Sequence, residues 1–263
     1  MLLRALRLPW LLAHLLLGLL LCVVLGIEGG RRLSPERIGQ RWARHLLRIL
    51  GIRLRIHGQP CAGGHLVVAN HVSWVDIFGL IASQPTRFVA KSEVQTWPVA
   101  GWLADAIGTF YIRRGKGGSR PLLARLTPFL QGGGTVTVFP EGTTTRGVDV
   151  LPFHPRLFSA AVEAQRPVQP VTLRYGSPAT GAAMVAFVGD DELVRHLWRL
   201  LRVRHLWLDL FYEPPLHPEL GRDELAASAE AAIRQRLQPR PAEPQPSAEA
   251  TPATRRVRRH LTA

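Results

Sequence analysis

A long apolar run near the N-terminus is the first pattern in the sequence. The residues from Leu8 to Ile27 are almost entirely apolar, and His14 is the one strongly polar residue among them. A membrane-spanning helix needs about 20 consecutive apolar residues. A secretory signal peptide has a shorter apolar core and a small-residue cleavage site, and no such site follows Ile27. We therefore predict a membrane-anchoring helix within residues 1–35, with a signal peptide or a buried helix of a soluble protein as the alternatives.

A basic, amphipathic stretch follows this run. Ile38, Trp42, Leu46 and Ile49 recur at nearly helical spacing. The pattern predicts a linker helix within residues 36–58, which either lies on anionic lipid headgroups or packs on the neighbouring domain as an ordinary surface helix. Six arginines follow the apolar run up to residue 48 and two precede it. This excess favours a downstream domain on the cytoplasmic side of the inner membrane.

From residue 52 to about residue 236, short apolar strands alternate with helical stretches. The predicted strands are Leu66–Ala69, Arg87–Ala90, Thr109–Ile112, Thr135–Phe139, Val168–Leu173 and Met184–Val188. The predicted helices are Trp74–Ala82, Val99–Ala106, Arg120–Gln131, Pro155–Ala164 and one that begins near Asp223. This alternation is typical of an α/β domain, which we place at residues 59–237. Residues 238–263 are rich in Pro, Ala, Glu, Gln and Ser and contain a basic cluster, which predicts a disordered basic tail.

The composition limits the classes of binding partner and the redox state of the compartment in which the protein works. The chain has 33 Lys and Arg against 19 Asp and Glu, a net charge of +14, which favours a polyanionic partner, either nucleic acid or an anionic membrane surface. Its two cysteines, Cys22 and Cys61, are too few for a disulfide scaffold or a zinc ribbon. We expect both to be free thiols in a reducing compartment.

The segment Asn70-His71-Val72-Ser73-Trp74-Val75-Asp76 directly follows a predicted strand. Functional residues of α/β proteins often lie at such strand ends. Asp76 comes five residues after His71, about one and a half helical turns, so its carboxylate can return to the imidazole. A carboxylate on one ring nitrogen fixes the tautomer and leaves the other nitrogen able to take a proton from a hydroxyl. Taken alone, a His–Asp pair of this kind is more often structural.

Three further segments follow predicted strands or lie in them. Phe139 to Gly147 forms a turn rich in small hydrogen-bond donors, which suits a phosphate or serves as a plain turn. The strand from Gly108 ends in Arg113 and Arg114, whose guanidinium forks match phosphate oxygens or are simply solvated. Val168-Gln169-Pro170-Val171 is an apolar strand with a proline, which on its own favours an edge strand.

Together and in this order, the four segments resemble the motifs of the glycerolipid acyltransferase family. Its first motif, Asn-His, four residues and Asp, is matched fully. Its second, Gly-x-x-Phe-Ile-x-Arg, is matched with a tyrosine in the aromatic place. The third, Phe-Pro-Glu-Gly-Thr-Arg, is matched as far as Thr143, and Thr144 stands where the family usually has Arg. The fourth, a Val-Pro-Val-like strand, is matched loosely, and the resemblance spans roughly residues 60–190.

The resemblance implies a mixed sheet flanked by helices and a membrane enzyme on the cytoplasmic face. Such an enzyme moves a fatty acyl chain from acyl-ACP or acyl-CoA to a lysolipid hydroxyl, here of 1-acylglycerol-3-phosphate, with no metal, no cofactor and no nucleic acid. His71 is the implied general base and Asp76 orients it. Arg113 and Arg114 are expected to hold the acceptor headgroup, and Glu141 to orient hydroxyls or these arginines. The residues expected to bind substrate are Asn70, Lys91, Arg113, Arg114, Glu141, Gly142, Thr143 and Arg146.

Because Thr144 replaces the arginine usual in the third motif, the motifs do not decide which lysolipid is the acceptor. Arg146, two residues on, can compensate for the missing arginine. The runs Leu151–Phe158 and Val168–Tyr175 also resemble the branch of the family that contains lyso-ornithine lipid acyltransferases, which makes lyso-ornithine lipid the alternative acceptor.

Other classes of protein fit the residues less well. Ser73 near His71 invites a serine hydrolase, but the chain has no Gly-x-Ser-x-Gly elbow. A metal site of His65, His71 and Asp76 lacks the usual His-x-x-x-His spacing or clustered carboxylates. A nucleic-acid-binding membrane protein accounts for the charge but not for the four motifs. A lipid-binding protein without catalysis is disfavoured because Asn70, His71 and Asp76 are all present.

Overall fold

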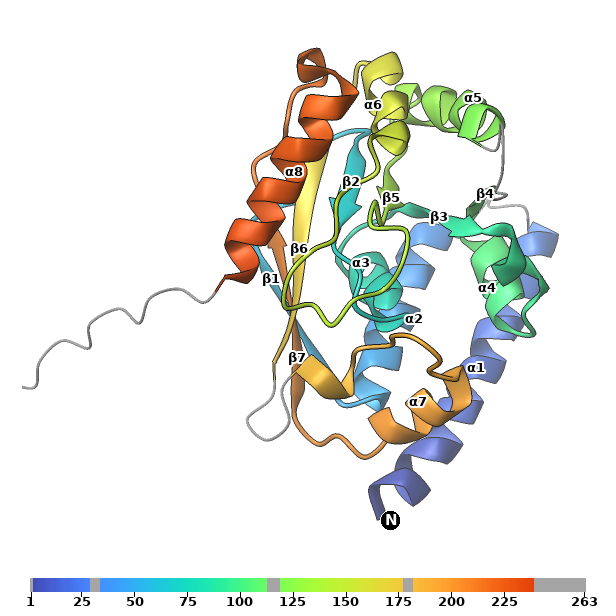
Figure 1. Ribbon diagram of the computed structural model, residues 1–263. Coiled ribbons are helices and arrows are strands. Elements are labelled where there is room, and N and C mark those ends of the chain that lie inside the picture. The colour runs from blue at the N-terminus through green and yellow to red at the C-terminus, as the bar shows by residue number, and fades with distance from the viewer. Residues whose placement is uncertain (1, 29–33, 113–118, 177–181, 239–263) are drawn as a thin grey trace, which may run out of the picture.

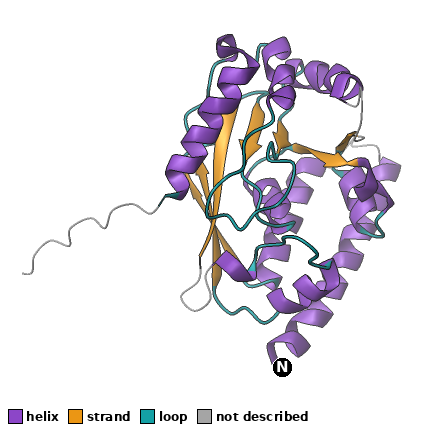
Figure 2. Cartoon of the chain, viewed as in Figure 1, coloured by secondary structure: helices purple, strands orange, loops and turns teal. Residues whose placement is uncertain are grey.

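The computed structural model describes residues 2–28, 34–112, 119–176 and 182–238. A seven-stranded sheet lies at its centre, with helices on both faces (Figures 1 and 2). The predicted α/β class, a mixed sheet flanked by helices, is therefore confirmed. The predicted tail lies outside the described residues, apart from Gln238.

The strands of the sheet lie in the order β1-β7-β6-β2-β5-β3-β4. All neighbouring strands are parallel except β6 and β7, which are antiparallel. The strands are β1 Ile52–His57, β2 Leu66–Ala69, β3 Arg87–Lys91, β4 Phe110–Ile112, β5 Val136–Val138, β6 Val168–Gly176 and β7 Leu206–Tyr212. The catalytic candidates follow β2, which lies in the middle of the sheet.

Eight α-helices and four short 3-10 helices occur in the described residues. The α-helices are α1 Leu2–Glu28, α2 Pro35–Ile49, α3 Val75–Ser83, α4 Ala100–Ala106, α5 Ser119–Gln131, α6 Ser159–Ala164, α7 Leu193–Leu200 and α8 Gly221–Leu237. The 3-10 helices are η1 Ser92–Thr96, η2 Pro155–Phe158, η3 Ala182–Met184 and η4 Pro218–Leu220.

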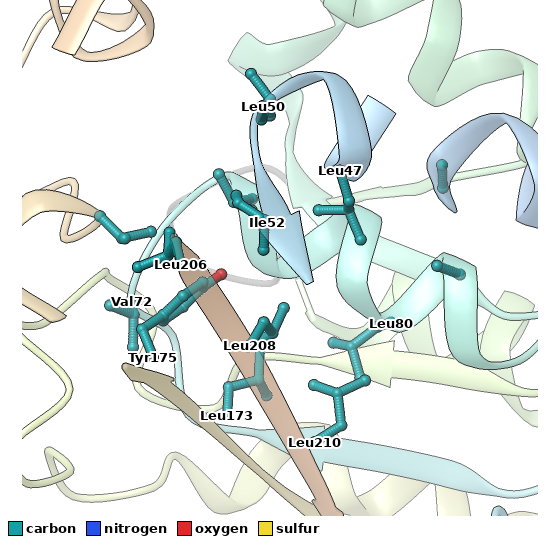
Figure 3. Close-up of a cluster of buried hydrophobic side chains, with 14 of the residues drawn as sticks. Leu47, Leu50, Ile52, Val72, Leu80, Leu173, Tyr175, Leu206, Leu208 and Leu210 are labelled. Atoms are coloured by element: carbon teal, nitrogen blue, oxygen red, sulfur yellow. The ribbon is translucent and has the colours of Figure 1, made fainter. Parts of the chain in front are cut away.

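Two apolar cores lie on opposite faces of the sheet. Val67 and Ala69 of β2 point into the core shared with α2, α3, β6 and β7, which Figure 3 shows in part. Leu66 and Val68 point into the core shared with α5, α6 and α8. This alternation is the period of two expected for a strand. Because β2 is buried on both faces, it is a rigid base for the residues that follow it.

Strand β1 corrects the predicted domain boundary. Residues 36–58 were predicted as one linker, but Ile52–His57 pairs in parallel with β7 and forms an edge of the sheet. The helical part of the linker, α2, buries Ala43, Leu46 and Leu47 against α3 and the sheet. Of the two interpretations of this helix, packing on the domain is thus the one observed for its apolar face, and the domain begins before residue 59.

The C-terminal half of the sheet differs from the predicted one. Met184–Val188 was predicted as a strand, but η3 ends at Met184 and the following residues form a loop. Val185 and Ala186 are buried, and the Phe187 N–H donates to the Val72 carbonyl at 2.9 Å. The apolar run therefore reflects burial rather than strand pairing. The last strand is instead β7, which the pattern did not predict.

Pro170 neither breaks β6 nor places it at an edge. Strand β6 lies between β2 and β7, and Pro170 is in register with Val68. On its other side, β6 faces the segment that follows β7, and the pairing there is irregular. The Glu213 N–H donates to the Pro170 carbonyl, whereas Val168 pairs with Leu216. A bulge of this kind accommodates a residue that has no N–H.

Helix α1 packs along the domain (Figure 1). Near its start, Arg7 Nη1 donates to the Val203 carbonyl at 2.6 Å. At its middle, His14 Nε2 donates to the Trp42 carbonyl at 2.9 Å and Trp42 Nε1 donates to the His14 carbonyl at 3.1 Å. Among the described residues α1 is the one helix long and apolar enough to cross a membrane, over Leu3–Ile27. It is thus the candidate anchor that the sequence predicts, and His14 joins it to α2.

We expect the substitution His14→Ala to weaken this junction. It removes one of the two reciprocal hydrogen bonds and the stacking of the His14 ring on Trp42, whose centroids are 4.8 Å apart. The expected loss is about 2 kcal/mol of unfolding free energy in detergent. Leu16→Ala is the control, because Leu16 points outward from α1 and is 67% exposed. Equal losses in the two variants would contradict the role of His14.

Candidate active site

The site begins where β2 ends. The side chain of Asn70 is fully buried, its Nδ2 donates to the Leu173 carbonyl at 3.0 Å and its Oδ1 accepts from the Leu173 N–H at 2.8 Å. Both polar ends of the carboxamide are therefore occupied by the backbone of β6. Asn70, predicted to bind substrate, lies behind the site in this structure and holds the turn that presents His71.

His71 and Asp76 form the predicted pair. His71 Nδ1 lies 2.8 Å from Asp76 Oδ2, and the carboxylate is fully buried. Because a carboxylate can only accept, Nδ1 carries the proton and Nε2 is the basic nitrogen. The imidazole stacks on Phe139, with ring centroids 3.9 Å apart, and lines a large cavity. The ring is thus held in one tautomer and one orientation, with its other side toward the cavity.

The Asp76 carboxylate accepts three hydrogen bonds besides that of His71. The backbone N–H groups of Val72 and Ser73 donate to Oδ2 at 2.6 and 2.8 Å, and the Tyr175 hydroxyl donates to Oδ1 at 2.6 Å. Hydrogen bonds of this number offset the cost of burying a charge. Burial and the neighbouring Asp76 raise the pKa of Tyr175 well above its usual range, so its hydroxyl stays protonated as a donor.

Glu141 holds the backbone of the site. It is 4% exposed, its Oε1 accepts from the His71 N–H at 2.8 Å and its Oε2 accepts from the Leu151 N–H at 2.9 Å. Burial raises the pKa of Glu141, and these two backbone bonds oppose the shift. Sequence reasoning expected this carboxylate to orient substrate hydroxyls or arginines. Here it fixes the position of the His71 backbone.

The loop after β5 closes over the same strand end. The Thr145 N–H donates to the His71 carbonyl at 2.7 Å. The Thr144 hydroxyl donates to the Phe187 carbonyl, so the residue at the family's arginine position ties this loop to the segment after η3. Gly142, with φ of 70°, and Thr143 line the cavity next to His71. The loop therefore forms part of the cavity wall and also holds the His71 backbone in place.

The cavity has a volume of about 2420 Å³ and lies beneath α1, α2, α3 and α4. Its lining is mostly apolar and includes Phe78, Phe88 and Phe139, of which Phe139 stacks on His71. An apolar cavity with few polar groups suits a ligand with a long hydrocarbon chain.

The predicted binding residues are brought together in part. The structure places Lys91, Glu141, Gly142 and Thr143 in the wall of the same cavity as His71. Arg146 is exposed and is not part of this wall. Arg113 and Arg114 lie outside the described residues, so their predicted role stays a prediction.

Sequence reasoning missed two residues of the site. Tyr175 reaches Asp76 from 99 positions away, on the neighbouring strand. Arg156, in η2, adds an exposed cation to the cavity wall. Both lie in runs that resemble the lyso-ornithine lipid branch of the family, which was the signal available in the sequence.

Comparisons with known proteins agree on the class. Residues 53–174 match the model of a family described as Acyltransferase. The chain is 43% identical over 203 residues to a lyso-ornithine lipid O-acyltransferase of Pseudomonas aeruginosa, covering 76% of this chain and 78% of that protein. It is 37% identical to the Rhodobacter capsulatus protein of the same name, covering 79% and 78%. It is 36% identical to a 1-acyl-sn-glycerol-3-phosphate acyltransferase of Neisseria meningitidis, covering 69% and 72%.

The fold is also similar to that of a solved structure. The crystal structure of the 1-acyl-sn-glycerophosphate (LPA) acyltransferase PlsC from Thermotoga maritima is similar with a TM-score of 0.60. The match covers 88% of this chain and 96% of that one, at 19% sequence identity. At this identity the likeness concerns the architecture alone.

Proposed function

Because this chain belongs to the acyltransferase family, we propose that it transfers a fatty acyl group from a thioester to the free hydroxyl of a lysolipid. The observation that carries the proposal is the His71–Asp76 pair, held at 2.8 Å, with the imidazole in the wall of a large apolar cavity. The acyl donor is acyl-ACP or acyl-CoA, used as a substrate, and the reaction draws on no cofactor.

His71 Nε2 removes the proton of the lysolipid hydroxyl as its oxygen attacks the thioester carbonyl. The new C–O bond forms, the C–S bond breaks, and the thiolate takes the proton back from the imidazolium. During the transfer the positive charge on the ring faces the buried Asp76 carboxylate, which stabilises it. General base catalysis by a positioned histidine contributes about 10²–10⁴ in rate.

The reaction takes place at a membrane. Helix α1 supplies an apolar outward face, on which Trp10 is 71% and Leu16 is 67% exposed. The excess of arginines after α1 supports a catalytic domain on the cytoplasmic side of the inner membrane. The net charge of +14 favours an anionic lipid surface as its partner.

Lyso-ornithine lipid is the acceptor that the observations favour. The two lyso-ornithine lipid acyltransferases named above are 43% and 37% identical to the chain. In addition, Thr144 replaces the arginine that the family usually carries in its third motif, and its hydroxyl is used by the Phe187 carbonyl. A site that lacks this guanidinium is less suited to a phosphate headgroup. Lysophosphatidic acid is the second candidate, supported by the 36% identity to the Neisseria meningitidis enzyme.

The test offers both acceptors to the detergent-purified full chain with a labelled acyl thioester. We expect His71-dependent product with a kcat/KM at least tenfold higher for lyso-ornithine lipid. Thr144→Arg should raise transfer to lysophosphatidic acid by about tenfold relative to lyso-ornithine lipid, the value of one charge-assisted hydrogen bond.

Thr144→Val is the matched control, since it removes the bond to Phe187 without adding a charge. It should lower both rates equally. Product from lysophosphatidic acid alone in the wild-type protein would refute the proposed acceptor but not the acyl transfer.

A further inference from the structure

The exposed tryptophans gather around α1. Four of the seven tryptophans are exposed, namely Trp10 in α1, Trp97 just before α4, Trp102 in α4 and Trp198 in α7. Helix α4 packs on α1, and α7 touches the first turn of α1 through Arg4. Tryptophan is enriched where a protein meets the boundary between lipid and water. This arrangement therefore indicates that a lipid-facing surface extends beyond α1 onto its neighbours.

Helix α7 lies beside the N-terminal half of α1 (Figure 1), and its inner face is fixed to the domain. His196 is fully buried, its Nδ1 accepts from the Trp74 indole N–H at 3.0 Å and its Nε2 donates to the Val185 carbonyl at 3.0 Å. Leu200, one turn further along, is buried as well. Because these contacts hold the inner face, the outer face of α7 points in one fixed direction.

The outer face of α7 combines apolar and cationic side chains. Val194 is 78% and Trp198 is 45% exposed, and a spacing of four residues places them on one side of the helix. Arg202, which follows directly after the helix, is exposed too. Arg4 Cζ lies 4.4 Å from the centroid of the Trp198 ring, and Arg4 Nε donates to the Trp198 carbonyl at 3.1 Å. We refer to Arg4, Val194, Trp198 and Arg202 as the α7 patch.

The two arginines of the α7 patch form no ion pair with another described residue. The two carboxylates just before α7 pair instead with Arg195 at 3.8 Å and with Arg199 at 2.9 Å. Desolvation and the nearby charge of Arg202 lower the pKa of Arg4, so the two guanidinium groups of the patch repel each other. An anion that contacts both groups would relieve this repulsion.

An anionic lipid surface fits the α7 patch better than another polyanion does. The patch adjoins α1, on which Leu6 is 58% and Trp10 is 71% exposed. A helix with an apolar, tryptophan-containing face flanked by arginines is typical of segments that lie in the interface of a bilayer. Anionic phospholipids of the cytoplasmic leaflet attract such arginines. The phosphate backbone of a nucleic acid would match the arginines but would leave Val194 without an apolar partner.

We propose that the α7 patch binds the anionic surface of a bilayer, so that α7 is a second membrane contact beside α1. The inference rests on the proposed location at a membrane and adds a surface that holds the domain against it. The valine and the tryptophan lie at the upper ends of the acyl chains, and the two arginines bind phosphate oxygens. Because the inner face of α7 is bonded to Trp74, which lies between His71 and Asp76, this contact also sets the distance of the site from the lipid surface.

The test measures the surroundings of Trp198 in the full chain, reconstituted into vesicles of phosphatidylcholine and phosphatidylglycerol. The contribution of Trp198 to the fluorescence is the difference between the wild-type protein and Trp198→Phe. We expect this contribution to lose at least about half of its intensity when the lipids are brominated near the headgroup end of their acyl chains, because the indole lies in the interface. Acrylamide dissolved in the water should quench it little.

Trp207→Phe is the matched control for the tryptophan. Trp207 points to the opposite face of the sheet from Leu206 and Leu208, which share a core with α1. The contribution of Trp207 to the fluorescence should therefore be insensitive to the brominated lipids.

A second variant tests the charge of the α7 patch. Arg202→Gln should lower the ratio of lipid-bound to free α7 about fivefold, the value of one basic residue at an anionic surface. The quenching of Trp198 by brominated lipids should decrease accordingly, and it should also decrease in vesicles of phosphatidylcholine alone. Arg222→Gln is the matched control, because it removes the same charge from the start of α8, which packs on the other face of the sheet. It should leave the quenching unchanged.

Quenching of Trp198 by acrylamide and not by brominated lipids would overturn the inference, because the α7 patch would then face water. Protection from both quenchers would overturn it too, because a second copy of the chain would then cover the patch. Equal quenching by brominated lipids in the two kinds of vesicle would remove the arginines from the contact and overturn the binding of anionic lipid.

These measurements separate the inference from the proposed function. None of them needs acyl transfer, so the absence of His71-dependent product would refute the proposed reaction and leave the result for α7 standing. Failure of the full chain to float with the vesicles would refute the membrane location together with the α7 contact.

Discussion

Replacing His71 by alanine is expected to reduce acyl transfer by about 10²–10⁴-fold, the contribution of a positioned general base. The effect should fall on kcat, because the imidazole acts on the proton that moves in the transition state. The fold should persist, since the supports of the loop are backbone groups. Glu141 accepts from the His71 N–H and Thr145 donates to the His71 carbonyl, and alanine keeps both.

The measurement is the steady-state rate of purified wild-type and variant protein at saturating acceptor, together with sedimentation with vesicles. His205→Ala is the matched control, because His205 is exposed and lies before β7, away from the cavity wall. It should leave rate and vesicle binding unchanged. A rate of His71→Ala close to that of wild type would remove the histidine from the reaction.

Asp76→Asn is expected to lower the rate by a similar factor while leaving the protein folded. The carboxamide oxygen can take the place of Oδ2 and accept from His71, Val72 and Ser73, while the new NH₂ group donates to the Tyr175 oxygen. The geometry is therefore retained, but the negative charge beside the imidazolium is lost. We expect kcat to fall about 10²–10⁴-fold and the unfolding free energy to change by less than about 2 kcal/mol.

Asp76→Ala separates charge from structure. It leaves two backbone N–H groups and the Tyr175 hydroxyl buried without an acceptor, which should cost at least about 3 kcal/mol of stability. Parallel measurements of kcat and denaturant unfolding on both variants check the prediction. Turnover of Asp76→Asn near the wild-type level would show that the reaction does not need the carboxylate charge.

The His71–Asp76 pair was predictable because its geometry is local. His71 and Asp76 are separated by one turn at a strand-to-helix junction, and the sequence spacing alone brings them together. The α/β class was predictable for the same reason, from alternating strands and helices. Tyr175 and Glu141 act from other strands or loops, and their hydrogen bonds to the site depend on strand order, which no local pattern contains.

The errors in the fold have a common cause. β1 carries Arg53, Arg55 and His57 on its outer face, which made it resemble a continuation of the basic linker. Within β7, Asp209 is buried but is paired with Arg55 at 2.6 Å, so a charge interrupts an otherwise apolar strand. Conversely, Met184–Val188 is apolar because it is buried, and its backbone pairs with the loop after β2 rather than with a strand. A short apolar run in the sequence can therefore arise either from a buried loop or from a paired strand.

The carboxamide of Asn70 acts as a substitute peptide group. It presents one donor and one acceptor to the carbonyl and the N–H of Leu173, while the main chain is already turning away toward His71. Aspartate lacks the donor and glutamine is one carbon longer, so neither reproduces this pairing. A preference for asparagine immediately before His71 thus follows from how strand β2 ends against β6.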